Sequence, residues 1–224
     1  MTSRHRLLSS VISTKLIIGA TGILLFLYLI VHIAGNLLVF LGQDTFNRYS
    51  YMLVSNPLVA PVEIGLLLVV LIHLFKAISM TVQNRAARPR PYAVKKMAGG
   101  TSQKSLASST MILTGLALLV FIPIHVAMFK YGPEYAYGAT GIRDLYRLEV
   151  ENFSSPVAVA LYVLAMVVVG FHLWHGVASS FQSLGLSGPR FTPAIRVIGK
   201  TAAVLIAGGF IVIAVWVFLY GVRS

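Results

Sequence analysis

The stretch that decides the fold runs from Leu16 to Leu41 and reads LIIGATGILLFLYLIVHIAGNLLVFL. It contains no Lys, Arg, Asp or Glu, and it exceeds the length of about 20 apolar residues that a helix needs to cross a bilayer. It is too long for the apolar part of a signal peptide, and no small-residue cleavage site follows it. We therefore predict a retained transmembrane helix over 16–41.

The rest of the chain is also apolar and poor in charged residues. Of 224 residues, 57% are hydrophobic and 11% are charged, whereas an ordinary soluble domain carries about 25% charged residues. Further apolar runs of spanning length lie at 58–82, 107–129, 156–181 and 195–221. The fold class predicted is an all-α membrane protein of five transmembrane helices, with the first four forming a bundle and residues 1–224 forming a single domain. The absence of Cys excludes disulfides, iron–sulfur clusters and covalently attached c-type haem.

The formal charge of +12 reflects sorting of charge between two sides of a membrane. Bases without acids occupy the N-terminal arm and the second-to-third and fourth-to-fifth connections, together with the adjoining helix ends: Arg4, Arg6, Lys15, Lys76, Arg85, Arg88, Arg90, Lys95, Lys96, Lys104, Arg190, Arg196 and Lys200. All 6 acids fall on the other side. The positive-inside rule predicts a cytoplasmic N-terminus and an external C-terminus, and nucleic-acid binding is not expected.

Two connections carry further predictions. The second-to-third connection is rich in Pro, Gly and Ser and predicts a mobile loop. The third-to-fourth connection predicts a short surface helix around Ile142–Val150.

Five of the 6 histidines lie in predicted spans: His32, His73, His125, His172 and His175. An ionisable side chain inside a membrane is costly and is a functional candidate, although a neutral imidazole can also join two helices by a hydrogen bond. A histidine in each of four consecutive spans, and none in the fifth, favours function.

Four of these histidines form two pairs, each pair at one depth in the membrane. Because alternate helices run in opposite directions, His32 and His125 fall together in the outer half of the membrane, and His73 and His172 fall together in the inner half. A four-helix bundle can hold two facing imidazoles on either side of a haem iron. We therefore predict two stacked b-type haems with these ligands.

An internal repeat supports the pairing. Thr21-Gly22 precedes His32 by the same spacing as Thr114-Gly115 precedes His125. Eleven helical residues place each threonine on the face of its histidine, about 16 Å away and level with the other haem, where the glycine lets a flat macrocycle approach the backbone.

The second and fourth spans share a second pattern, His-Leu-x-x-small, at His73 and His172. The pattern selects His172 over His175 as the ligand, and both repeats indicate a duplicated helical hairpin.

The run Lys15…Thr21-Gly22…His32-Ile33-Ala34-Gly35-Asn36-Leu37, with one histidine in each of four spans, resembles the di-haem cytochrome b membrane anchor of succinate dehydrogenases (succinate:quinone oxidoreductases) and fumarate reductases, in its single-chain, five-helix type. His172-x-x-x-Gly176, followed by Gly185, is similar to the ligand segment of that family. The resemblance extends over the whole chain.

This resemblance implies that His73 and His172 hold the inner haem, and that His32 and His125 hold the outer one. It also implies an iron–sulfur subunit and a flavoprotein subunit on the cytoplasmic face of a bacterial cell membrane, with electrons passing through the haems to menaquinone or ubiquinone. That complex is respiratory complex II of the tricarboxylic acid cycle, and its dicarboxylate site would not lie on this chain. The resemblance is also compatible with a higher oligomer of this complex. Some fumarate reductases of this type have a proton-coupling glutamate where this chain has Gly170.

Polar residues at the two membrane edges are candidate contacts for quinone or haem propionates. The candidates are Ser13, Lys15, Asn36, Glu63, Lys76, Arg85, His175 and Ser179, with Phe46, Asn47 and Tyr49 also near the outer haem.

Two other classes stay open. One is the cytochrome b anchor of a formate dehydrogenase or hydrogenase. The other is a transporter or metal-handling protein, which would predict carboxylates or broken helices near the midplane; Glu63 is the acid within a span, and it lies near one end.

Overall fold

The computed structural model describes residues 10–87 and 106–221, and the regular structure in these ranges is helical. Five helical segments are long and apolar enough to cross a membrane: α2 (Val11–Asn36) with the 3-10 turn η1 (Leu37–Leu41), α4 (Val59–Ala86), α6 (Met111–Phe129), α8 (Pro156–Ser183) and α9 (Thr192–Tyr220). The shorter helices are α3 (Gln43–Val54), α5 (Leu106–Ser109) and α7 (Leu145–Phe153). The predicted all-α membrane fold with five spanning helices is confirmed.

Several helix boundaries differ from the prediction. Helix α2 begins at Val11 because the hydroxyl of Ser10 accepts a hydrogen bond from the backbone N–H of Ser13 at 3.1 Å and caps the first turn. Helix α4 continues to Ala86, so Arg85 lies in its last turn and not in the connection. The connection predicted to be mobile falls mainly on residues 88–105, which lie outside the described residues.

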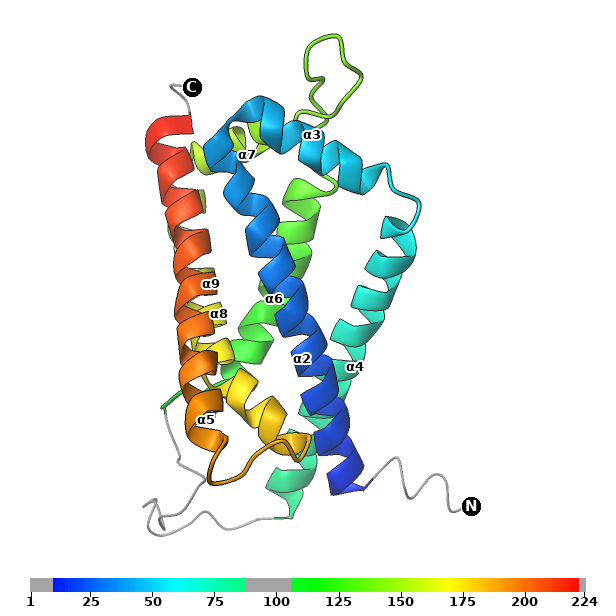
Figure 1. The fold of residues 1–224 in the computed structure, drawn as a ribbon, viewed down its shortest axis with the longest axis vertical. Coiled ribbons are helices and arrows are strands. Elements are labelled where there is room, and N and C mark those ends of the chain that lie inside the picture. The colour runs from blue at the N-terminus through cyan, green and yellow to red at the C-terminus, as the bar shows by residue number, and fades with distance from the viewer. Residues whose placement is uncertain (1–9, 88–105, 222–224) are drawn as a thin grey trace.

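The spanning helices alternate in direction (Figure 1). Helices α2, α6 and α9 run toward the end that carries α3 and α7, called the upper end below, while α4 and α8 run toward the opposite, lower end. The predicted outer half of the bundle corresponds to the upper end. Helix α8 packs against α9, α2 and α6, whereas α4 packs chiefly against α2.

The tightest packing lies between α8 and α9. Buried side chains on α8 recur every three or four residues from Val159 to Val177, which forms one apolar stripe. Small residues let the two backbones approach, because a Cβ on Gly170 would lie 3.2 Å from that of Ala207. Within the described chain, neither α4 nor α6 has a buried residue. The fifth span therefore serves as a support for α8.

Two helices cross the upper end. Helix α3 was not predicted, and α7 lies close to the surface helix predicted around Ile142–Val150. They are joined by a buried polar cluster, in which the Asn47 amide donates to Asp144 at 2.8 Å and accepts from the backbone N–H of Tyr146 at 2.9 Å. Gln43 also donates to Asp144, at 2.7 Å. This cluster fixes the two helices over the end of the bundle.

Candidate haem-binding site

The upper end of the bundle brings two of the predicted histidines together. The imidazole rings of His32 on α2 and His125 on α6 have centroids 5.9 Å apart and planes at 85°. Tyr28 stacks on His32 with centroids 5.4 Å apart, and Phe121 stacks on His125 at 5.6 Å. Two imidazoles from different helices thus meet edge to face inside an aromatic shell, at one level as the alternating helix directions predict.

His125 has a polar neighbour on α8. The hydroxyl of Tyr162 lies 3.2 Å from Nδ1 of His125 and 3.6 Å from the sulfur of Met128. Because a thioether sulfur is a weak acceptor, the hydroxyl can either donate to Nδ1 or accept from Nδ1–H. With Nε2 of His125 on a metal, Nδ1 would carry the proton and Tyr162 would accept a hydrogen bond from it.

Asn36 contacts the second histidine of the upper pair. Its side-chain amide donates to the backbone oxygen of His32 at 2.8 Å and lies 3.4 Å from Nδ1 of the same ring. The shorter bond orients the amide. The longer contact is too weak to determine which ring nitrogen of His32 carries the proton.

The lower half of the bundle repeats one contact in both hairpins. Oγ1 of Thr21 on α2 lies 2.9 Å from Nδ1 of His73 on α4. Oγ1 of Thr114 on α6 lies 3.1 Å from Nδ1 of His172 on α8. The threonine of each Thr-Gly pair therefore contacts the histidine of the following span, at the level of the lower pair.

Each threonine hydroxyl also has a carbonyl to which it donates. Thr21 lies 2.7 Å from the backbone oxygen of Ile17, and Thr114 lies 3.0 Å from that of Met111. With its proton so engaged, each hydroxyl accepts from the Nδ1–H of its histidine. The lone pairs on Nε2 of His73 and His172 are consequently free, which is the tautomer that a metal ligand requires.

The glycines of the repeat lie against the same histidines. A Cβ on Gly22 would lie 3.5 Å from Cε1 of His73, and one on Gly115 would lie 3.5 Å from Cε1 of His172. Gly22 has a second constraint, because its Cβ would also lie 2.7 Å from Oγ of Ser180 on α8. The two glycines thus occupy matching places, and Gly22 in addition permits the close crossing of α2 and α8.

His175 lies one turn below His172 on α8 and within electrostatic range of it. Ser179 follows one further turn toward the lower end and is half-buried. Of the basic candidates, Lys15 and Arg85 are exposed, and Lys76 is half-buried on α4. All of these residues lie in the lower half of the bundle.

Two candidate contacts have partners of their own. Ser13 donates to the backbone oxygen of Ser10 at 2.9 Å and belongs to the start of α2. Glu63 forms a salt bridge with Lys130 at the upper end. In addition, the amide of Asn47 is engaged between α3 and α7, so it is not available to a quinone.

A carboxyl that sequence reasoning did not single out lies buried at the upper end. Glu149 on α7 is 4% exposed, and burial raises its pKa to about 8. It lies within electrostatic range of Tyr162, which is itself hydrogen-bonded to His125. Tyr162 was also missed, although it precedes His172 by ten residues, about 15 Å along a helix, and so falls level with the upper pair.

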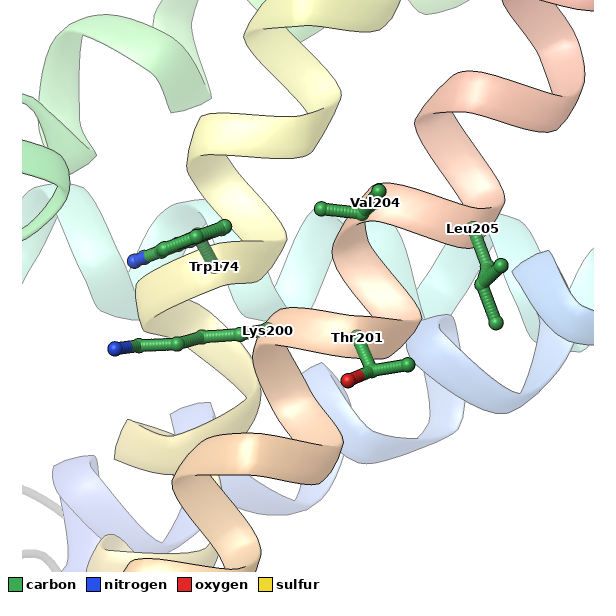
Figure 2. Close-up of a pocket in the computed structure, with 5 residues that line it drawn as sticks. All are labelled: Trp174, Lys200, Thr201, Val204 and Leu205. Atoms are coloured by element: carbon green, nitrogen blue, oxygen red, sulfur yellow. The ribbon is translucent and has the colours of Figure 1, made fainter.

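Two hollows lie on the outside of the bundle. One, of about 310 Å³, is lined by Trp174 on α8 and by α9, where Lys200 lies 5.3 Å from the centre of the Trp174 ring (Figure 2). The other, of about 370 Å³, lies between α6 and α8, and its apolar lining includes Phe121, Met128 and Tyr162. The second hollow therefore borders the environment of His125.

Comparison with known proteins identifies the class. Residues 86–216 match the family described as succinate dehydrogenase/fumarate reductase transmembrane subunit. No match was found among curated proteins or among solved structures. The matched segment includes α6, α7, α8 and most of α9, and with them His125 and His172. Because it covers more than half of the chain, the protein belongs to the family of succinate dehydrogenase/fumarate reductase transmembrane subunits.

Proposed function

We propose that this chain is a di-haem cytochrome b anchor, which carries electrons between an iron–sulfur subunit and membrane quinone. His32 and His125 would hold the upper haem iron, and His73 and His172 the lower one. The observation that carries the proposal is the hydrogen bonding of His73 and His172, because in each ring a threonine hydroxyl that donates to a backbone carbonyl accepts from Nδ1–H and leaves Nε2 free.

The donor set fits a b-type haem. Two neutral imidazoles per iron satisfy bis-histidine ligation, and the absence of Cys is consistent with a haem held without thioether bonds. When bound, each haem supplies a one-electron couple. The chain supplies orientation, through the hydroxyls on Nδ1, and a largely apolar surrounding that keeps water from the iron.

Family membership sets the assembly. The chain is a membrane subunit of a succinate dehydrogenase or fumarate reductase complex, which implies soluble partner subunits. We propose that these are an iron–sulfur subunit and a flavoprotein that carries the dicarboxylate site. The membership disfavours an anchor of formate dehydrogenase or hydrogenase and a transporter.

We propose that the lower end faces the cytoplasm of a bacterial cell and that residues 1–224 form one transmembrane domain. The support is the distribution of charge, since the 6 acids lie at the upper end or in the connections near it. Reporter fusions test this orientation. Alkaline phosphatase fused after Ser224 should be active and green fluorescent protein dark there, and the reverse pattern would overturn the topology.

The quinone site is proposed at a membrane edge next to one of the histidine pairs. Asn36 and Glu63 are the candidates at the upper pair, where the apolar hollow between α6 and α8 offers room for an isoprenoid tail. Ser13, Lys15, His175 and Ser179 are the candidates at the lower pair, with Lys76 and Arg85 as propionate partners.

Haem content tests the central proposal. The complex purified from membranes should yield about two b-type haems per chain by pigment extraction and reduced-minus-oxidised spectra. A purified complex without b-type haem would contradict the proposal. A haem-to-chain ratio near one would contradict the presence of two haems. His172→Ala should remove one haem and His175→Ala should remove none. The opposite result would reassign the ligand to His175.

The electron donor tests the class. Succinate added to membranes that contain the complex should reduce the haems, whereas formate or hydrogen should not. Reduction by formate or hydrogen alone would contradict the proposed function.

A further inference from the structure

The inference concerns the two threonines of the lower half, and it rests on the proposed di-haem function. We propose that Thr21 and Thr114 are positioning residues for the lower haem: each accepts a hydrogen bond from the Nδ1–H of one ligand, and together they lower the reduction potential of that haem.

The direction of both hydrogen bonds follows from the local helix geometry. Thr21 is 7% exposed, and the carbonyl oxygens of Ile17 and Ile18 lie 2.7 and 3.2 Å from its hydroxyl. Thr114 is half-buried, and its hydroxyl has equivalent partners, the carbonyl oxygens of Thr110 and Met111 at 3.1 and 3.0 Å. A hydroxyl directed at these carbonyls presents only its lone pair to the histidine.

The contacts connect each threonine to a haem other than the one held by its own helix. Thr21 lies on α2, which carries the upper ligand His32, but it bonds to the lower ligand His73. Thr114 lies on α6, which carries His125, but it bonds to His172. Loss of the hydroxyl of Thr21 on α2 or of Thr114 on α6 should therefore affect the lower haem and spare the upper one.

The expected effect follows from ligand basicity. An acceptor on Nδ1–H draws the proton away from the ring and increases the electron density at Nε2, which stabilises the ferric iron. Since both ligands of the lower haem have such an acceptor, removal of either hydroxyl should raise its midpoint potential. Removal of both should raise it further.

The experiment uses isosteric substitutions in the whole complex. Thr21→Val, Thr114→Val and the double variant remove the hydroxyls, whereas Thr21→Ser and Thr114→Ser retain them. Thr81→Val is the matched control, because Thr81 on α4 is half-buried like Thr114 and its hydroxyl donates to the backbone carbonyl of Ala77 at 2.9 Å. Redox titrations resolve the two haems, and the His172→Ala spectrum shows which signal is the lower one.

We expect the lower-haem potential to rise in both Val variants, with the upper haem unchanged and with wild-type behaviour in the Ser variants and in Thr81→Val. Selective loss of the lower haem in a Val variant, with retention in the Ser variant, also supports positioning. Unchanged potentials with both haems retained, a shift of the upper haem, or loss of both haems would overturn the inference.

The wild-type haem content and the Val variants separate the proposed function from the role of the threonines. A wild-type complex without two b-type haems would contradict the proposed function. A wild-type complex with two haems, but with Val variants that behave like Thr81→Val, would contradict only the role of the threonines.

Discussion

The hydroxyl of Tyr162 on α8 lies within hydrogen-bond distance of Nδ1 of His125 on α6, at 3.2 Å. With Nε2 of His125 on the iron, as proposed, Nδ1 carries the proton and this hydroxyl accepts from it. It is the counterpart at the upper pair of the two threonines at the lower pair. Tyr162→Phe removes this acceptor while it retains the ring that packs on Phe153 and Phe129. We expect the midpoint potential of the upper haem to rise and that of the lower haem to stay unchanged in a redox titration.

Tyr135→Phe is the control for this substitution. Tyr135 lies at the same end, but its hydroxyl bonds to Glu151 on the surface. Equal shifts in the two variants would show that the effect does not pass through His125.

Glu149 should make stability depend on pH. Burial raises its pKa to about 8, above the value of about 4.3 in an unfolded chain. The folded state therefore holds a proton that the unfolded state releases, and stability falls as the pH rises from about 4.3 to about 8. Glu149→Gln should remove this fall and stabilise the protein by a few kcal/mol at pH 8. Thermal unfolding in detergent between pH 5 and 9 measures the effect.

Glu134→Gln provides the comparison, since Glu134 is exposed in the same connection. A Glu149→Gln variant with the pH profile of wild type would show that the buried carboxyl does not take up a proton in the folded state.

Asn47 should contribute strongly to the attachment of α3. Asn47→Ala deletes the bonds to Asp144 and to the backbone N–H of Tyr146, and it leaves buried polar groups without partners. We expect a loss of about 2–4 kcal/mol and faster hydrogen exchange in α3 and α7. Asn56→Ala, which removes an exposed bond to the N–H of Leu58, should cost much less. Equal effects of the two variants would contradict the role of the buried cluster.

Gly19 should be required where α2 crosses α8. An added Cβ would lie 3.0 Å from the backbone oxygen of Ser180 and 3.1 Å from Cβ of Ser183, and a backbone atom cannot move aside cheaply. Gly19→Ala should therefore cost about 1–3 kcal/mol in unfolding experiments. Gly65→Ala in α4, where nothing lies within 4 Å, should be neutral or slightly stabilising. A Gly19→Ala variant as stable as wild type would show that α2 and α8 have room for a methyl group where they cross.

The spans and the levels of the histidines could be predicted because each depends on one helix at a time. Hydropathy locates a span, and position along it gives depth. His32 and His125 are therefore expected at one level, and their ring centroids lie 5.9 Å apart. Helix α3 was not predicted because its sequence is too polar to be found by a hydropathy search for membrane spans. Its stability depends on contacts with α7, which are distant in the sequence.

The contacts of the threonines could be predicted only in part. Helix geometry placed Thr21 and Thr114 level with the lower pair, but a hydrogen bond also requires a particular rotation of two neighbouring helices. That rotation is fixed by packing, as at Gly22 against Ser180, and single-helix periodicity does not contain it. The contact of Tyr162 with His125 was not predicted for the same reason, because it also depends on the rotation of neighbouring helices.

The two hairpins α2–α4 and α6–α8 each contribute one histidine to the upper pair and one to the lower pair. Under the proposed assignment, neither hairpin contains a complete ligand set for any iron. The upper haem can acquire both axial ligands once α6 has entered the membrane, whereas the lower haem lacks one until α8 follows, because His172 lies on α8. Cofactor loading is therefore sequential in biogenesis, and a chain truncated before α8 should be unable to complete the lower haem.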